Sequence, residues 1–139
     1  MKTKTNNAKD ILLKKGLKPT YQRITIYDFL DKNRIHPTVD KIYSMIHQHI
    51  PTISRTTIYN TLDLFLEKRL VMGLTIGGAE KHYDVNVASH HHFYCLKCRQ
   101  VFDIKINCPF YNDKHPLIDG NLVQETHGYF RGTCKTCAQ

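Results

Sequence analysis

The chain has 139 residues, of which 41% are hydrophobic, and it carries a formal net charge of +8 at pH 7. These residues can bury a core, but the chain is short for two large domains. We therefore expect two compact halves, or one domain plus a lobe completed by dimerisation. No apolar run approaches the roughly 18 residues of a membrane span. The polar amino-terminal residues lack the apolar segment of a signal peptide, so we expect a cytoplasmic protein without a membrane partner.

The positive charge is concentrated in the first half of the chain. Residues 1–75 contain 13 Lys and Arg against 6 Asp and Glu, whereas residues 76–139 contain 7 against 6. A basic half beside a nearly neutral one indicates a polyanionic partner for the basic half, because neutralised phosphates release counterions. Charge alone fits an ordinary solubilising surface equally well.

The first two predicted helices are marked by their capping residues. Residues 7–15 end at Gly16, which fits a short helix with a glycine C-cap. A second helix begins after Pro19 with Thr20 as its N-cap. Its predicted buried residues are Ile24, Tyr27, Phe29 and Leu30. A loop over residues 33–37 follows, because Pro37 disfavours a helical conformation for His36.

Two further helices follow this loop. Thr38 caps the third, whose predicted apolar residues are Ile42, Met45 and Ile46. The fourth follows Ser54, and its apolar face has the spacing i, i+4, i+7 over Ile58, Leu62 and Phe65. A different face of the fourth helix then carries Arg55, Thr56, Tyr59 and Asn60.

A change of pattern after the helices predicts strands. Residues 71–76 and 79–87 fit two strands joined at Gly77 and Gly78, since paired glycines permit positive φ. Helices followed by a β-ribbon predict a winged-helix domain over residues 1–84. Residues 85–139 form the second predicted domain, with strands around 91–95, 100–106 and 121–130. The predicted fold class is α+β.

Four of the five cysteines form two CxxC motifs, Cys95 with Cys98 and Cys134 with Cys137. Each motif places two thiolates on one tight turn, and two such turns supply the four ligands of a tetrahedral Zn²⁺ ion. A closed shell of four cysteines leaves no open position for substrate, so the predicted role is structural. A pair of redox CxxC motifs and unligated buried thiols are the alternatives. Cys108 stands alone, and we expect a packed or idle thiol.

A second group of candidate ligands surrounds the first cysteine motif. It comprises Asp84, His90, His92 and Asp103. Alternate side chains of a strand share a face, so His90 and His92 can point at one ion while His91 faces away. Imidazole and carboxylate together suit Fe²⁺, Mn²⁺ or Zn²⁺ rather than Ca²⁺ or Mg²⁺. A surface run of histidines is the alternative explanation.

Six segments in order resemble the pattern of Fur-family regulators over nearly the whole chain. They are LKPTYQR at 17–23, HPTVDKIY at 36–43, ISRTTIYNTL at 53–62, HYD at 82–84, HHHFYCLKC at 90–98 and CKTC at 134–137. The resemblance implies a winged-helix DNA-binding domain followed by a small α/β dimerisation domain with the four-cysteine zinc site. It also implies a homodimeric repressor that binds double-stranded operator DNA and is not an enzyme.

The resemblance implies five ligands for a regulatory Fe²⁺ or Mn²⁺ ion, namely His36, Asp84, His90, His92 and Asp103. With aspartate at position 103 the chain resembles the peroxide-sensing PerR branch, whereas iron-responsive Fur proteins usually carry glutamate there. Asparagine at position 60 is also similar to that branch. In PerR proteins peroxide oxidises a ligand histidine, which points here to His36 and His90. An iron-responsive Fur-type repressor is the main alternative. A zinc sensor is the least favoured branch of the family.

The predicted DNA contacts lie in the helical half. Arg55 and Asn60 are the candidate base readers, because Arg pairs with guanine edges and Asn with adenine in the major groove. Thr56 and Tyr59 lie on the same face. Arg23, Lys15 and Lys18 are candidate phosphate contacts. A solvated helix face explains these residues equally well without the family resemblance.

Two other classes of protein are alternatives to a repressor. A zinc-dependent hydrolase or deaminase could use the histidine cluster, but the HxE and downstream PCxxC motifs of deaminases are absent. A zinc-ribbon adaptor without DNA binding is disfavoured by the basic half. One departure from the family pattern concerns residues 108–121, where Pro109, Pro116 and Gly120 predict that the dimerisation helix is short. His115 and His127 have expected surface or core roles.

Overall fold

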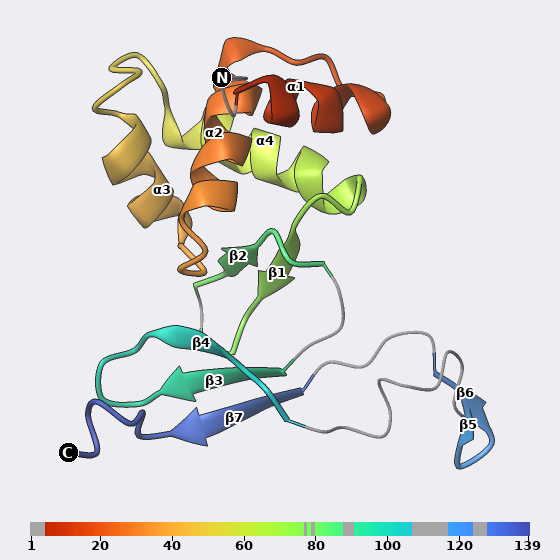
Figure 1. Ribbon diagram of the computed structural model, residues 1–139, viewed down its shortest axis with the longest axis vertical. Coiled ribbons are helices and arrows are strands. Elements are labelled where there is room, and N and C mark those ends of the chain that lie inside the picture. The colour runs from red at the N-terminus through yellow and green to blue at the C-terminus, as the bar shows by residue number, and fades with distance from the viewer. Residues whose placement is uncertain (1–4, 77, 79, 88–90, 107–116, 124–127) are drawn as a thin grey trace. The chain divides into compact units, whose positions relative to one another are not determined.

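The structure, a computed structural model, describes residues 5–76, 78, 80–87, 91–106, 117–123 and 128–139 (Figure 1). The chain divides into two compact units, Met1–Val87 and Ala88–Gln139. The sequence placed the boundary slightly earlier, between residues 84 and 85. Among the described helices, none has the length and apolar character needed to cross a bilayer.

The first unit begins with four helices, as the sequence predicted. They are α1 (Thr5–Lys14), α2 (Tyr21–Lys32), α3 (Val39–Ile46) and α4 (Arg55–Glu67). Each predicted N-cap is confirmed: the side chains of Thr20, Thr38 and Ser54 accept hydrogen bonds from backbone N–H groups in the first turn. Gly16 has φ of +73°, which confirms the glycine cap after α1.

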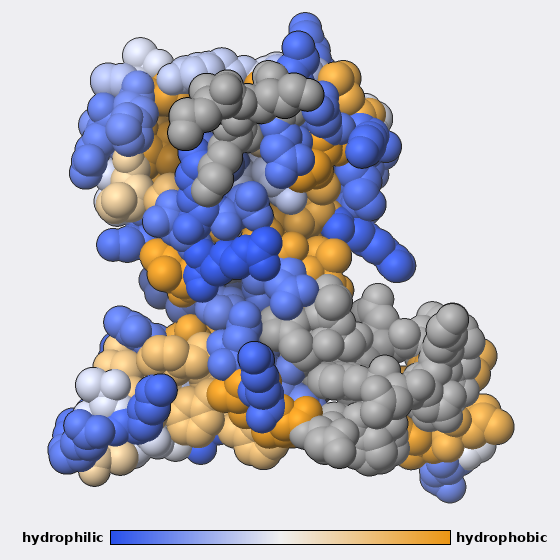
Figure 2. All heavy atoms as spheres, in the orientation of Figure 1, coloured by the Kyte–Doolittle hydropathy of each residue, from blue (hydrophilic) through white to orange (hydrophobic). Residues whose placement is uncertain are grey.

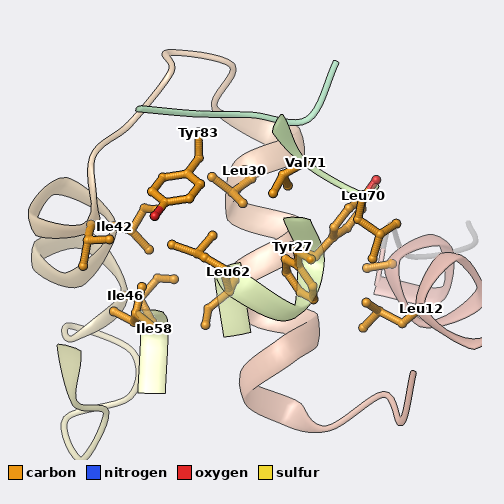
Figure 3. Close-up of a cluster of buried hydrophobic side chains, with 14 of the residues drawn as sticks. Leu12, Tyr27, Leu30, Ile42, Ile46, Ile58, Leu62, Leu70, Val71 and Tyr83 are labelled. Atoms are coloured by element: carbon orange, nitrogen blue, oxygen red, sulfur yellow. The ribbon is translucent and has the colours of Figure 1, made fainter. Parts of the chain in front are cut away.

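The helices enclose the core of this unit (Figure 3). Ile58, Leu62 and Phe65 of α4 are all fully buried, as their spacing predicted. Two details of the prediction were wrong. In α2 the buried stripe is centred on Ile26, Tyr27 and Leu30, with Ile24 and Phe29 only partly buried at its flanks. In α3, Met45 is 38% exposed, because Ile42 and Ile46 already occupy the face that packs inward.

The wing completes the first unit. Strand β1 (Met72–Leu74) pairs antiparallel with β2 (His82–Asp84), so that Met72 lies opposite Asp84. Both strands are shorter than predicted. Gly78 has φ of +118°, which is the conformation expected at this turn, while Gly77 lies outside the described residues. Four helices followed by a two-stranded ribbon confirm the winged-helix prediction.

The second unit is built on strand β3 (His91–Cys95). It pairs antiparallel with β4 (Val101–Ile104) on one side and parallel with β7 (Gly128–Gly132) on the other. Because β3 and β7 are parallel, both lead to a cysteine motif at the same end of the sheet. Cys95 is the last residue of β3, and Cys134 follows β7 closely. The sheet therefore brings the two CxxC motifs together although they are far apart in the sequence.

Residues 121–130, predicted as one strand, instead contribute to two sheets. Strand β6 (Asn121–Leu122) pairs with β5 (Leu117–Ile118) in a separate hairpin. Asp119 and Gly120 both have positive φ at its turn, so the chain reverses within the segment 108–121, where a short helix was predicted. Most of the expected dimerisation helix, together with Cys108, His115 and His127, lies outside the described residues.

The cap of α4 gives a first test of the fold. Replacing Ser54 by alanine removes the hydroxyl that accepts the Thr57 N–H at 3.0 Å. We expect S54A to lower the free energy of unfolding by about 1 kcal/mol. S54T keeps a hydroxyl and should lose only a fraction of that amount. Urea unfolding followed by circular dichroism measures both variants, and equal losses would contradict a capping role.

Candidate metal centres and nucleic-acid interface

The four cysteines of the two CxxC motifs converge at one point in the second unit. Their sulfur atoms all lie within 4.8 Å of one another, and Cys98 Sγ is 3.9 Å from Cys134 Sγ. All four are free thiols rather than disulfides. Two independent redox motifs would not require this convergence, so the geometry favours a shared ligand.

Hydrogen bonds already prepare Cys95 to carry negative charge. The backbone N–H groups of Cys98 and Cys134 each donate to Cys95 Sγ over 3.4 Å, and they lower the pKa of this thiol to about 6. The pKa of Cys137 is raised to about 12, chiefly because its side chain hydrogen-bonds with Cys134. Thiols this close cannot all ionise without a cation among them. This donor set fits a Zn²⁺ ion, which binds thiolates in a tetrahedron.

His36 is held in an unusual conformation in the first unit. Its φ is +54°, in the left-handed region that few residues other than glycine adopt, and such positions cluster at functional sites. The side chain is buried, and Nε2 lies 3.3 Å from Oδ2 of Asp84, which is equally buried. The structure thus pairs an imidazole and a carboxylate that the sequence separates by a large distance.

Contacts between the loop before α3 and strand β2 maintain the His36 conformation. Nδ1 of His82 donates to the carbonyl oxygen of His36 over 2.7 Å. The N–H of Tyr83 donates to the carbonyl oxygen of Pro37 over 3.0 Å. His82 was not among the predicted site residues. Its position two residues before Asp84 in the HYD segment was the available signal.

A second imidazole and carboxylate pair lies in the second unit. His92 on β3 is directly opposite Asp103 on β4, and His92 Nε2 lies 3.3 Å from Asp103 Oδ1. His92 is only 3% exposed, which does not fit a surface run of histidines. His91 packs on the opposite side, with its ring 5.9 Å from that of Phe130. His90 lies outside the described residues.

The predicted DNA-contacting residues of α4 are all exposed. Arg55, Thr56, Tyr59 and Asn60 lie in the first two turns of the helix, in which Ile58 is buried. Arg55 makes two contacts with α3, an ion pair with Asp40 and a stacking contact with the ring of Tyr43. Neither α3 residue was predicted to matter, because sequence periodicity does not reveal contacts between helices.

Three further predicted DNA contacts lie near the start of α2. Lys15 and Lys18 are exposed, and Arg23 is half-buried. Nη1 of Arg23 donates to the carbonyl oxygen of Lys18 over 3.0 Å, so these two residues belong to one local surface. Hydrophilic side chains cover much of the visible face of the helical unit, while hydrophobic ones reach the surface of the strand-rich unit (Figure 2).

Comparison with known proteins gives a consistent result. The model of the ferric uptake regulator family matches residues 14–109. The chain is 30% identical to the peroxide operon regulator of Bacillus subtilis over 135 residues, which cover 95% of this chain and 92% of that protein. It is 38% identical to the peroxide-responsive repressor PerR of Staphylococcus epidermidis over 92 residues, covering 66% of this chain and 61% of the relative's length.

A solved structure shows the same fold. The ferric uptake regulator of Francisella tularensis with iron matches with a TM-score of 0.73 at 22% identity, covering 89% of this chain and 96% of that one. The matching family and both named relatives are described as regulators, as the family resemblance implied. The chain therefore belongs to the ferric uptake regulator family.

Proposed function

We propose that this protein is a metal-dependent transcriptional repressor that binds operator DNA as a homodimer and is released by peroxide. The proposal is carried by two His–Asp pairs, His36 with Asp84 and His92 with Asp103, each with its Nε2 and a carboxylate oxygen 3.3 Å apart. Identity to two peroxide-responsive regulators supports the choice of signal. Aspartate rather than glutamate at position 103 agrees with this choice.

The first proposed ion is structural Zn²⁺, held by Cys95, Cys98, Cys134 and Cys137. Its support is the convergence of the four sulfur atoms and the two N–H donors on Cys95. All four protein ligands are cysteines, so no position is left for a substrate. The role of this ion is to stabilise the sheet that carries the second His–Asp pair.

The second proposed ion is regulatory Fe²⁺ or Mn²⁺. Each His–Asp pair supplies two donors, fewer than a first-row transition metal takes in a stable protein site. We therefore assign both pairs, together with His90, to one ion. Mixed imidazole and carboxylate ligands suit iron and manganese, and iron is present in the related Francisella tularensis structure. Such an ion would tie the winged helix to the second unit.

Occupancy of that site would then regulate DNA binding. A dimer must present its two α4 helices to successive major grooves about 34 Å apart. Shifting the population of the competent arrangement from 1:99 to 99:1 requires about 5.5 kcal/mol of differential affinity, which a multidentate metal site can supply. An Fe²⁺ ion held there would supply the redox chemistry that activates peroxide. The imidazole of His36 or His90 would then take up one oxygen atom of hydrogen peroxide, the other leaving as water. The oxidised imidazole would be a poorer ligand, so repression would end.

The experiment that tests this function first selects DNA sequences that the protein binds. It then measures release of the protein from the selected DNA. Mn²⁺-loaded protein is used to enrich binding sequences from random duplex DNA, and binding is then measured by fluorescence anisotropy. We expect affinity for the enriched sequence to fall about 100-fold when Mn²⁺ is removed by a chelator, because the competent fraction falls from about 99% to about 1%. Fe²⁺-loaded protein should release that DNA after peroxide, whereas Mn²⁺-loaded protein should keep it.

Two outcomes would contradict parts of this proposal. Enrichment of no sequence by metal-loaded protein would remove the repressor function and favour a zinc-ribbon adaptor. If DNA binding depends on iron but persists after peroxide treatment, the protein is still a repressor. Its signal is then the iron level, as in the iron-responsive alternative.

A further inference from the structure

Two contacts from α3 hold the side chain of Arg55, the first residue of α4. Its Nε–H donates to Oδ1 of Asp40 over 2.9 Å. Its guanidinium carbon lies 4.1 Å from the centre of the Tyr43 ring. The side chains of Arg55 and Asp40 are 56% and 67% exposed, so the guanidinium makes these contacts at the surface and remains open to an incoming partner.

These contacts leave a defined set of donors on Arg55. Asp40 takes Nε–H, and Tyr43 covers one face of the guanidinium plane, so the N–H groups of Nη1 and Nη2 remain at its outer end. Guanine presents N7 and O6 side by side in the major groove, and an arginine binds them with two parallel hydrogen bonds. The first residues of a recognition helix are those that reach base edges.

We propose that Asp40 and Tyr43 are positioning residues, which fix Arg55 for reading one guanine and so determine the base specificity of α4. This inference rests on the proposed function, since it requires that α4 enter the major groove. Ordering the guanidinium before DNA arrives lowers the entropic cost of the bidentate contact, because the side chain loses less freedom on binding.

Simple electrostatics makes the opposite prediction for Asp40. An exposed carboxylate repels phosphates, so its removal alone would strengthen binding to any DNA sequence. The chain offers a matched control, because Asp31 of the same unit pairs with Arg34 over 3.0 Å and not with Arg55. D40N and D31N change the net charge equally, and only D40N releases Arg55.

The test compares these variants on the operator enriched by the wild-type protein. Each G·C pair of the operator is replaced in turn by A·T, and dissociation constants are measured with Mn²⁺-loaded protein. We expect D40N to lose about two- to tenfold of the wild-type discrimination at one G·C pair, and D31N to lose none. Y43F keeps the ring and should retain the preference, whereas Y43L should reproduce the loss. In an R55A background, D40N should cause no further loss.

Three results would overturn the positioning role. They are equal discrimination by D40N and D31N, a gain of operator affinity confined to D40N, and an undiminished effect of D40N in the R55A background. Each can occur while metal-dependent operator binding is intact, so it leaves the proposed function standing. Failure of wild-type protein to enrich any sequence would instead reject both.

Discussion

Replacing Cys134 by serine is expected to abolish zinc binding and to unfold the second unit. Cys134 is buried, and its N–H donates to Cys95 Sγ over 3.4 Å. Among the described residues of this unit, few hydrophobic side chains are buried, namely Tyr94, Cys95, Val101 and Cys134. Binding of structural Zn²⁺ contributes about 10–16 kcal/mol in small zinc domains, which exceeds the net stability of most domains.

The matched control for C134S is C108S, because Cys108 lies outside both CxxC motifs. Elemental analysis by mass spectrometry measures zinc per chain, and thermal unfolding by circular dichroism measures stability. We expect one equivalent of zinc in the wild-type protein and in C108S, and none in C134S. A folded C134S protein that retains its zinc would show that the four cysteines do not form the proposed site.

The second large effect is expected for H36A. His36 is the only proposed regulatory ligand on the loop before α3, and its ring is buried with Nε2 3.3 Å from the Asp84 carboxylate. Removing it should weaken Mn²⁺ binding by more than about 100-fold, since loss even of residues that only support ligands costs 10–100-fold. DNA binding should then become insensitive to Mn²⁺. Isothermal titration calorimetry and fluorescence anisotropy measure the two effects.

H49A provides the control for this variant. His49 is an exposed histidine of the same unit and is not a proposed ligand. It should leave both metal affinity and operator binding unchanged. H36A protein that remains folded and still binds operator DNA in a Mn²⁺-dependent way would show that the regulatory ion does not require His36.

Local features of the fold could be predicted from the sequence, because they depend on a few neighbouring residues. The caps at Thr20, Thr38 and Ser54 are examples. A hydroxyl just before an amphipathic segment can accept a hydrogen bond from a backbone N–H in the first turn of the helix. Burial at the edge of a helix's apolar face was less predictable: Met45 was predicted to be buried, but it is exposed. The pairing of β3 with β7 was not predictable, because it joins segments that no local pattern connects.

The candidate sites show the same division. The spacing of the cysteines within each motif predicted a shared zinc ion, and the structure brings their sulfur atoms together. Residues that act through another residue were missed. Asp40 and Tyr43 have no motif of their own, and their relation to Arg55 arises only where α3 packs on α4. His90 lies outside the described residues, so its assignment rests on its spacing from His92 and on the family resemblance.

The most direct test of peroxide sensing is mass spectrometry of the Fe²⁺-loaded protein after brief exposure to hydrogen peroxide. We expect one added oxygen atom on peptides that contain His36 or His90, together with release of operator DNA in the same sample. Protein loaded with Mn²⁺ should show neither change. Unmodified His36 and His90 in Fe²⁺-loaded protein that still binds DNA after exposure would contradict the account and identify iron level as the signal.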